Sequence, residues 1–353
     1  MSPRLHCFVA PTGLGGAAPG GAAAALPRIR GPQRPPAVAR RARRPTTMAV
    51  PTLTSAAADY IATSIPDVGT VLPPKSGPSG SGWASTAVVD TSSGRSFFVK
   101  TAPRPAAAMF VAEAAGLRAL AAAAAASGAE VVIPTAYAAR DGDGGSFLVM
   151  DAVPMGGRVD MARLGDAVGA IHAAPPPPAD VAGGTGYGFG VTAGTIGGSV
   201  QRNGWMDDWP AFWVERRLRP QLAATRDDAL IREGAKLCDA VPAFFADVPA
   251  PAASCLHGDL WGGNYGATPE GVPVLFDPAT YYGHAEAEFG MSWCASFNQR
   301  FYDAYHARMP RAAGADARED LYTLYHILNH ANLFGGGYRS QAAGLIKSLL
   351  RRA

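Results

Sequence analysis

Apolar and polar residues change their spacing along this sequence, and each change predicts an element of secondary structure. Runs typical of strands occupy residues 84–90, 96–101, 131–138 and 146–150. A long helix is expected over 106–126, and a short one over 53–65. The first part of the chain is therefore predicted to form a sheet accompanied by two helices.

The second half of the chain is predicted to be mostly helical. Apolar residues recur at helical spacing over 159–173, 209–223, 230–245, 297–308, 320–334 and 341–351. Proline and glycine runs separate these segments, because neither residue continues a helix well. The glycine-rich segment 183–198 is either an insertion over a cleft or plain surface packing. The apolar run Val272–Phe276 predicts one strand among the helices.

The composition is that of a globular protein, with 48% apolar and 17% charged residues among 353. No membrane-spanning helix is expected, because the alanine-rich run Ala119–Ala126 is far shorter than the roughly 20 residues that a bilayer requires. The cysteines, Cys7, Cys238, Cys255 and Cys294, show no CxxC spacing. This argues against structural zinc and against a disulfide framework.

Residues 1–48 differ in composition from the rest. The first 58 residues hold eight arginines, no lysine and no acidic residue, and the chain's +3 less these eight charges leaves −5. Such an arginine-rich, acid-poor segment is typical of an organelle transit peptide. A disordered basic tail, or an extension before a true start at Met48, are the alternatives. A chloroplast protein is expected, with the mitochondrion or cytoplasm as alternatives, and the mildly acidic body implies no nucleic-acid partner.

One stretch carries residues suited to phosphoryl transfer. Asp259 is followed five residues later by Asn264, and Asp277 comes after the predicted strand. Such transfer needs a carboxylate to accept the proton of the attacking hydroxyl, and oxygen ligands for Mg²⁺. The stretch has the form H-x-D-x-x-x-x-N, with Gly258 where protein kinases usually carry arginine, which favours small-molecule kinases. A polar turn between two strands is the structural alternative.

A second group of residues fits ATP binding. Gly80 and Gly82 precede the strand 84–90, where glycines let backbone amides close over phosphates, although a flexible linker explains them as well. Lys100 ends a predicted strand and Glu113 lies in the next helix, the pair that orients ATP phosphates in kinase-like folds. The backbone groups expected to meet adenine belong to a hinge at Met150, Asp151, Ala152 and Val153.

On these residues, the chain resembles the fructosamine kinase family, or ketosamine 3-kinases, and particularly its plant-type protein-ribulosamine 3-kinases. The resemblance extends from about residue 55 to the end. Its most specific segments are LHGDLWGGN (256–264), FDPATYYGHAEAEFGMSW (276–293) and LYHILNHANLFGGGYR (324–339). The later two separate this family from choline and aminoglycoside kinases, which share the fold.

The resemblance implies a two-lobed α+β fold of the protein-kinase type. Residues 55–151 would form a small ATP-binding lobe, and residues 152–353 a larger helical lobe for catalysis and acceptor binding. The implied activity is ATP-dependent phosphorylation of the sugar 3-hydroxyl of ketosamines, namely ribulosamine, erythrulosamine or fructosamine adducts on protein lysines or free amines. This step initiates deglycation.

The resemblance also implies roles for individual residues. Asp259 is the expected proton acceptor, Asn264 and Asp277 the expected Mg²⁺ ligands, and Lys100 with Glu113 the expected ATP-orienting pair. Candidates for the acceptor pocket are Trp261, His284, Glu286 and His330. For Trp261, a buried residue bridging loop and core is an equal alternative.

Two rival functions follow from the same residues. One is another small-molecule kinase of the choline or aminoglycoside phosphotransferase type, and the other is a non-catalytic kinase-like binding module. Lys100, Glu113, Asp259, Asn264 and Asp277 are all present, which argues against the second.

No membrane partner is expected, and the protein is expected to be a monomer or weak dimer. Trp83 stands where the family often carries a cysteine, so no loop disulfide is expected.

A chain starting near Met48 should keep the melting temperature and activity of the full chain, because a segment without apolar periodicity contributes little to a core.

Residues 1–60 fused to a fluorescent reporter should direct it to the plastid. Thermal melts and microscopy test both, and a diffuse cytosolic signal would contradict the transit-peptide interpretation.

Overall fold

The computed structural model describes residues 55–73, 79–81, 84–103, 105–142 and 145–353. All of these residues belong to one compact unit, Pro51–Ala353. Residues 1–48, Gly82 and Trp83, for which the sequence makes predictions, lie outside the described residues.

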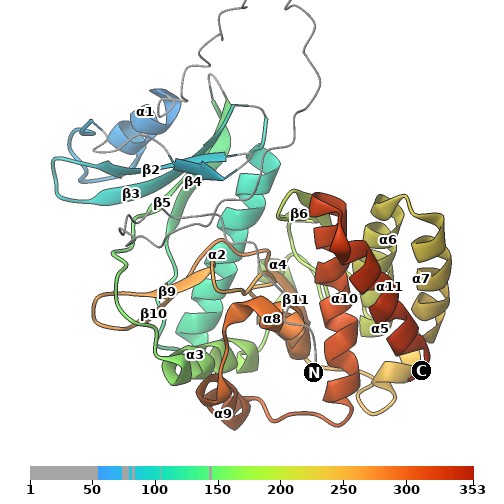
Figure 1. Cartoon of the computed structure of the whole chain (residues 1–353). Coiled ribbons are helices and arrows are strands. Elements are labelled where there is room, and N and C mark those ends of the chain that lie inside the picture. The colour runs from blue at the N-terminus through green and yellow to red at the C-terminus, as the bar shows by residue number, and fades with distance from the viewer. Residues whose placement is uncertain (1–54, 74–78, 82–83, 104, 143–144) are drawn as a thin grey trace, which may run out of the picture. The chain divides into compact units, whose positions relative to one another are not determined.

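An antiparallel five-stranded sheet forms the first part of this unit (Figure 1). Its strands are β1 (Ser79–Ser81), β2 (Ala84–Asp90), β3 (Ser96–Ala102), β4 (Ala136–Gly142) and β5 (Gly145–Asp151). They lie in the order β1-β2-β3-β5-β4, so β3 is central. Lys100 on β3 pairs with Thr86 on one side and Leu148 on the other. The central position fixes this lysine through two strand pairings.

Alternation of side chains along β3 and β5 gives the sheet two apolar faces. One face packs Phe97, Val99, Phe147 and Val149 against helix α1 (Ser55–Ser64). The other packs Leu148 and Met150 against Phe110, Ala114 and Leu117 of helix α2 (Ala107–Ser127). The sheet is therefore enclosed between two helices.

Helix α2 is long and apolar enough to cross a membrane, by length and composition alone. The expectation of no such helix overlooked it, because that expectation considered only the alanine-rich run. The buried residues of α2 include Phe110, Leu117 and the carboxylate-bearing Glu113, and they pack on the sheet and on β4. A core helix of a globular domain passes the same criteria, so the finding is weak evidence for a membrane span.

The rest of the unit is mostly helical. Its α-helices are α3 (Met161–Ala173), α4 (Ala179–Ala182), α5 (Trp209–Phe212), α6 (Arg219–Thr225), α7 (Asp228–Ala240), α8 (Ser292–Ala295), α9 (Gln299–Arg308), α10 (Ala315–Phe334) and α11 (Gly337–Leu350). Short strands pair in twos: β6 (Ala193–Ile196) with β7 (Ser199–Arg202), β8 (Ala253–Leu256) with β11 (Tyr281–His284), and β9 (Tyr265–Ala267) with β10 (Pro273–Leu275). These ribbons carry the loops that form the site.

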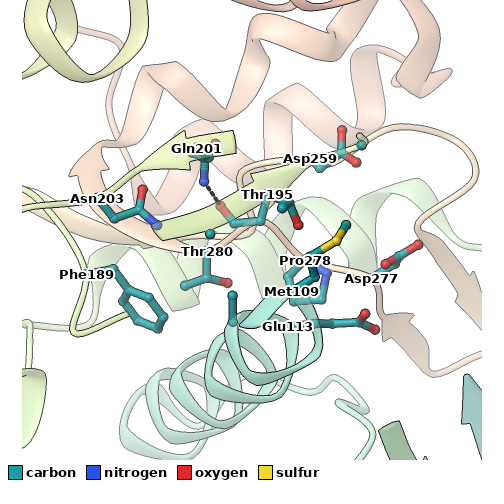
Figure 2. A pocket seen from close by; sticks show the side chains of 14 residues that line it. Met109, Glu113, Phe189, Thr195, Gln201, Asn203, Asp259, Asp277, Pro278 and Thr280 are labelled. Carbon is teal, nitrogen blue, oxygen red and sulfur yellow. Dashed lines mark hydrogen bonds between the residues drawn. The ribbon is translucent and has the colours of Figure 1, made fainter. Parts of the chain in front are cut away.

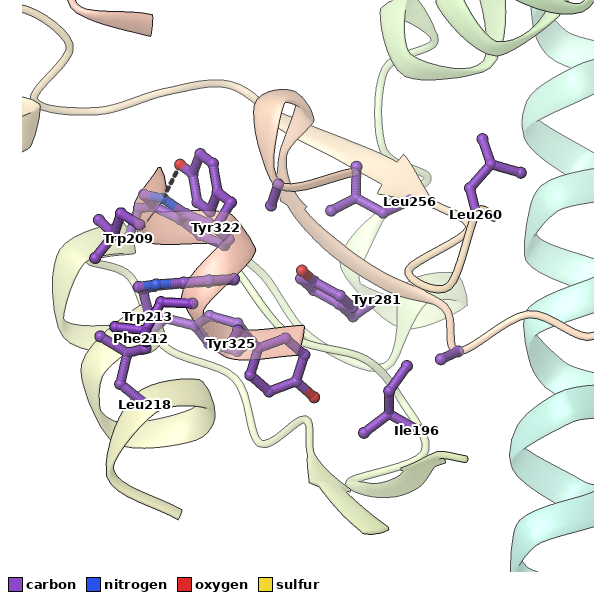
Figure 3. Close-up of a cluster of buried hydrophobic side chains, with 14 of the residues drawn as sticks. Ile196, Trp209, Phe212, Trp213, Leu218, Leu256, Leu260, Tyr281, Tyr322 and Tyr325 are labelled. Atoms are coloured by element: carbon purple, nitrogen blue, oxygen red, sulfur yellow. Dashed lines mark hydrogen bonds between the residues drawn. The ribbon is translucent and has the colours of Figure 1, made fainter. Parts of the chain in front are cut away.

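A cluster of aromatic side chains joins these helices (Figure 3). Trp209, Trp213 and Tyr322 are fully buried, and the Trp213 and Tyr322 rings meet edge to face with centroids 4.8 Å apart. The indole N–H of Trp209 donates to the Tyr322 hydroxyl at 3.1 Å, which satisfies one polar group inside the core. Aromatic residues of the segment 209–223, which the sequence predicts to be helical, therefore lie in the core.

Two predicted segments differ from the structure for local reasons. Residues 131–135 are not part of strand β4, because Pro134 cannot donate to a ladder. Val132 instead bridges to Val274 of β10. At the end of the glycine-rich segment 183–198, β6 forms a hairpin with β7, which follows the segment. The two-residue turn is Gly197-Gly198, and Gly197 has a φ of 56°. Two glycines between short strands are a hairpin signal that the loop interpretation passed over.

Candidate active site

The loop that follows β8 carries Asp259, and its backbone path requires glycine at position 258. Gly258 has a φ of 79°, and an added Cβ would lie 2.3 Å from the carbonyl oxygen of Ala279. The Ala279 N–H also donates to the His257 carbonyl at 2.8 Å. The two segments therefore run in close contact, which leaves no room for the arginine that protein kinases usually carry here.

The buried carboxylate of Glu288 fixes the backbone of the loop that carries Asp259. The N–H groups of His257 and Gly258 donate to the carboxylate of Glu288 at 2.6 and 2.8 Å. His172 Nε2 lies 3.2 Å from the same carboxylate, and its Nδ1 lies 2.9 Å from the Tyr305 hydroxyl. Burial would raise the pKa of Glu288, but the bonds from His172 and the backbone hold that pKa below its ordinary value. Sequence reasoning missed Glu288.

The structure brings Asp259, Asn264 and Asp277 together. The Asn264 amide nitrogen donates to the Asp259 carbonyl at 2.8 Å and to the Asp259 carboxylate at 3.1 Å, and it lies 3.4 Å from the Asp277 carbonyl. Burial, and then the charge of Asp277, raise the pKa of Asp259 well above its ordinary value. A carboxylate with a raised pKa holds a transferred proton more readily.

Lys100 joins the sheet to helix α2 and to the segment of Asp277 after β10. Its ammonium group lies 2.7 Å from the Glu113 carboxylate on α2 and 2.8 Å from the Asp277 carboxylate. Burial raises the pKa of Glu113 to about 7 in spite of the opposing charge of Lys100. Asp277 has a φ of 59°, a left-handed conformation uncommon for a residue with a side chain. Such conformations persist where the surroundings enforce them, often at functional sites.

Several elements meet at a cavity of about 90 Å³ next to these carboxylates. Figure 2 shows Asp259, Asp277 and Glu113 at one end and Phe189 and Asn203 toward the other. Helix α2, the β6–β7 hairpin and the segment 277–280 supply its walls. The glycine-rich segment thus includes part of a cavity wall, one of the two interpretations that the sequence left open.

Some backbone groups of the segment 150–153, which is predicted to contact adenine, are already hydrogen-bonded within the protein. The Met150 side chain lies in the core beside α2, and the Asp151 N–H donates to the Thr135 carbonyl at 3.0 Å. The Ala152 N–H donates to the Ser96 carbonyl at 3.1 Å. The Val153 N–H makes no hydrogen bond within the described part of the chain, so it remains open to a ligand. Gly80 lies in β1, paired with Ser85.

The structure does not bring His284 and Glu286 to the cavity beside Asp259. Strand β11 runs antiparallel to β8, so His284 pairs with Ala253, at the end of β8 away from the Asp259 loop. The His284 Nδ1 lies 2.7 Å from the Tyr322 hydroxyl, and Glu286 accepts two bonds from the buried Arg318 guanidinium at 2.7 and 2.9 Å. These contacts commit both side chains to the helical core.

Trp261 and His330 lie elsewhere again. Trp261 is half-buried, and its ring covers Gly263, where an added Cβ would lie 2.3 Å from the indole. The His330 ring is 5.4 Å from that of Trp293 and 5.1 Å from that of Tyr338, measured between centroids. Neither residue lines the cavity beside Asp259. Trp261 is part of the loop that carries Asp259. His330 is next to that loop through Trp293 of α8, because the carbonyl of Cys294 on the same helix accepts the Gly262 N–H at 3.2 Å.

A sheet lysine, a helix glutamate and an Asp–Asn–Asp set together define a kinase-type phosphotransferase, and solved structures share the fold. An aminoglycoside phosphotransferase in complex with AMP-PNP and hygromycin B matches with a TM-score of 0.53 and 15% identity, over 84% of this chain and 98% of that one. A protein from Thermobifida fusca, provisionally named a fructosamine-3-kinase, matches with a TM-score of 0.67 and 27% identity, over 81% of this chain and 96% of that one. The predicted two-lobed, protein-kinase-like fold is confirmed.

Sequence comparison then gives the family. Residues 74–352 match the fructosamine kinase family model. A protein of Arabidopsis thaliana named protein-ribulosamine 3-kinase, chloroplastic, is 42% identical over 263 residues, which are 72% of this chain and 76% of that protein. The chain belongs to the fructosamine kinase family.

His284 should make folding stability depend on pH. Burial lowers its pKa from 6.5 to about 4, so the unfolded chain binds more protons than the folded one between these values. The free energy of unfolding should therefore fall as the pH falls below 6.5, by about 2 kcal/mol from this group between pH 7 and pH 5. Urea unfolding at both pH values, on wild type and His284→Gln, measures it. An equal loss in both proteins would contradict the assignment.

Proposed function

We propose that this chain is an ATP-dependent ketosamine 3-kinase, which phosphorylates the sugar 3-hydroxyl of glycation adducts. Membership of the fructosamine kinase family supports this activity. The observation that carries the proposal is the contact of one amide, Asn264, with both Asp259 and Asp277, within reach of the Lys100–Glu113 pair. A polar turn without a catalytic role would not require these five side chains to converge from the sheet, α2 and two loops.

In the proposed reaction, Asp259 accepts the proton of the 3-hydroxyl as its oxygen attacks the γ-phosphorus. The new bond joins that oxygen to phosphorus, while the bond from phosphorus to the β–γ bridging oxygen breaks and ADP leaves. The raised pKa of Asp259 suits this role, since a proton acceptor works best when its pKa approaches the working pH. The amide of Asn264 fixes the orientation of the carboxylate.

Asn264 and Asp277 are the proposed Mg²⁺ ligands. The Asn264 nitrogen is committed to Asp259, which leaves its Oδ1 oxygen without a hydrogen bond in the described part of the chain. The Asp277 side chain is 53% exposed, so its second oxygen is accessible. One amide oxygen and one carboxylate fit a cation that takes its remaining ligands from phosphates and water. Bound Mg²⁺ would neutralise charge on the transferring phosphoryl group.

Lys100 and Glu113 are the proposed pair that orients the α- and β-phosphates of ATP. Lys100 is buried between Glu113 and Asp277, so its ammonium group has a fixed position. Gly80 and Gly82 are proposed to approach the phosphates. Of the four hinge residues, Val153 is the one whose open N–H is proposed to contact adenine.

Ribulosamine adducts are the proposed preferred acceptors, and the chloroplast the proposed compartment. The name of the Arabidopsis thaliana relative contains both terms. Trp261 and His330 remain proposed acceptor contacts because they neighbour the loop of Asp259, whereas His284 and Glu286 are bonded within the core. The deciding experiment offers Mg-ATP and a panel of ribosylated and fructosylated lysines, choline and aminoglycosides, and locates the new phosphate by NMR. Turnover of choline or aminoglycosides alone would overturn the proposal.

Asp259→Asn should reduce kcat by roughly 10²- to 10⁴-fold, the usual effect of losing a general base. The fold should survive, because the asparagine oxygen can still accept the Asn264 bond. Steady-state kinetics with a thermal melt tests this, and Asp303→Asn on the exposed surface of α9 is the matched control. A near-normal kcat in Asp259→Asn would remove this residue from the mechanism.

Asp277→Ala should weaken the use of Mg-ATP more than the binding of acceptor, because it removes a proposed metal ligand and a partner of Lys100. The measurement is the dependence of rate on Mg²⁺ at fixed acceptor, together with separate KM values for both substrates. An unchanged Mg²⁺ requirement would show that the metal assignment is wrong.

A further inference from the structure

The cavity beside Asp259 has a polar end that none of the assigned roles uses. It is lined there by Thr195 of β6, Asn203 just after β7 and Thr280, with Phe189 nearby (Figure 2). At about 90 Å³, the whole cavity has room for on the order of six water-sized groups. This is too small for a nucleotide and suitable for several carbons with their hydroxyl groups.

Thr280 supplies a hydroxyl with no protein partner. The residue is 3% exposed, and its Oγ1 atom is buried without a hydrogen bond to any described residue. Native proteins pair the great majority of buried polar groups. The Thr280 hydroxyl lies against Gly116 of α2, where an added Cβ would be 2.8 Å from it, so a ligand in the cavity bonds to it once the Thr280 side chain rotates. The Thr195 hydroxyl also makes no hydrogen bond within the described residues. Two unsatisfied hydroxyls thus line one cavity.

Asn203 is oriented by a buried guanidinium group. Arg217 is fully buried, stacks over Tyr281 at 4.0 Å from the ring centroid, and donates to the Asn203 Oδ1 at 3.0 Å. This bond assigns the oxygen of the amide to Arg217 and leaves the NH₂ group on the other side. The NH₂ group has one long contact, 3.4 Å to the Val191 carbonyl, so it retains donor capacity.

The charge of the lining restricts the ligand. Glu113, Asp259 and Asp277 line the cavity, and among the residues that the structure describes no lysine or arginine side chain does. Away from Glu113 and Asp277, which are paired with Lys100, a phosphate or carboxylate group would find no lining cation to pair with it. Neutral hydroxyl groups suit this lining, because hydroxyls both donate and accept while the amide donates.

We propose that Thr195, Asn203 and Thr280 form a subsite for the sugar hydroxyls of the acceptor that are not phosphorylated. The subsite lies along the cavity from Asp259, and Phe189 limits the length of sugar chain that it accepts. This inference rests on the proposed function, since it concerns the acceptor of that same reaction. It assigns recognition of the polyhydroxyl chain to the β6–β7 hairpin and the residue three positions after Asp277.

Thr280→Val tests the subsite, because valine keeps the shape and removes only the hydroxyl. Loss of one neutral hydrogen bond to a ligand should raise the KM for a ketosamine roughly three- to tenfold. The KM for ATP should not change, and the melting temperature should stay equal or rise, because an unpaired buried hydroxyl is removed. Thr280→Ser should restore the acceptor KM. Thr192→Val, an exposed position that does not line the cavity, is the matched control.

Acceptors that lack single hydroxyls beyond C3 identify the bonded group. One such analogue should show a raised KM with wild type and no further increase with Thr280→Val. Thr195→Val, at a half-buried position, provides the same measurement if Thr280→Val does not fold. An unchanged acceptor KM in a folded variant would overturn the subsite while leaving the kinase proposal intact. Absence of ketosamine turnover by wild type would overturn both.

Discussion

Two backbone N–H groups of the loop that carries Asp259 depend on one buried carboxylate. His257 and Gly258 both donate to Glu288, which is 2% exposed and is itself contacted by His172. Hydrogen bonds to a charged group contribute about 1.5–3 kcal/mol each, and loss of the acceptor would leave two buried donors unpaired. The position of Asp259 is thus set by a residue 29 positions later in the chain.

A second fixed connection gives the β6–β7 hairpin its role. The side-chain amide of Gln201 donates to the Ala279 carbonyl at 2.8 Å, and its oxygen accepts from the Tyr325 hydroxyl at 3.0 Å. Arg217 adds bonds to the Arg202 carbonyl and to Asn203. The hairpin is therefore tied to the Asp277 segment and to α10, and its glycine-rich composition does not make it a loose insertion.

Local spacing in the sequence was enough to select residues that the structure brings together. Asp259, Asn264 and Asp277 follow one another along a short stretch, and Lys100 and Glu113 occupy a strand and the helix after it, so a pattern identifies them. Their convergence is seen in the structure. The main strands and helices followed in the same way from the spacing of apolar residues.

Sequence patterns could not predict the positions of residues that depend on how strands pair. His284 and Glu288 are four positions apart, and the sequence does not show which of them lies near the loop that carries Asp259. The antiparallel register of β11 and β8 places His284 away from that loop, and the turn after β11 places Glu288 next to it. A register cannot be read from a four-residue strand that is buried on both faces, because no alternation marks it. The lining of the cavity by Thr195 and Asn203 likewise depends on a hairpin docking that no local pattern records.

Lys100 and Asp277 are separated by 177 positions, yet their side chains form one ion pair. Contacts of such separation form late, because the chain between them must first lose its conformational freedom. While the protein is being synthesised, the sheet and its lysine emerge long before their partner carboxylate. The growing chain therefore cannot form the site before residue 277 has been synthesised. A fragment that ends earlier would hold the pair Lys100–Glu113 without the carboxylate of Asp277.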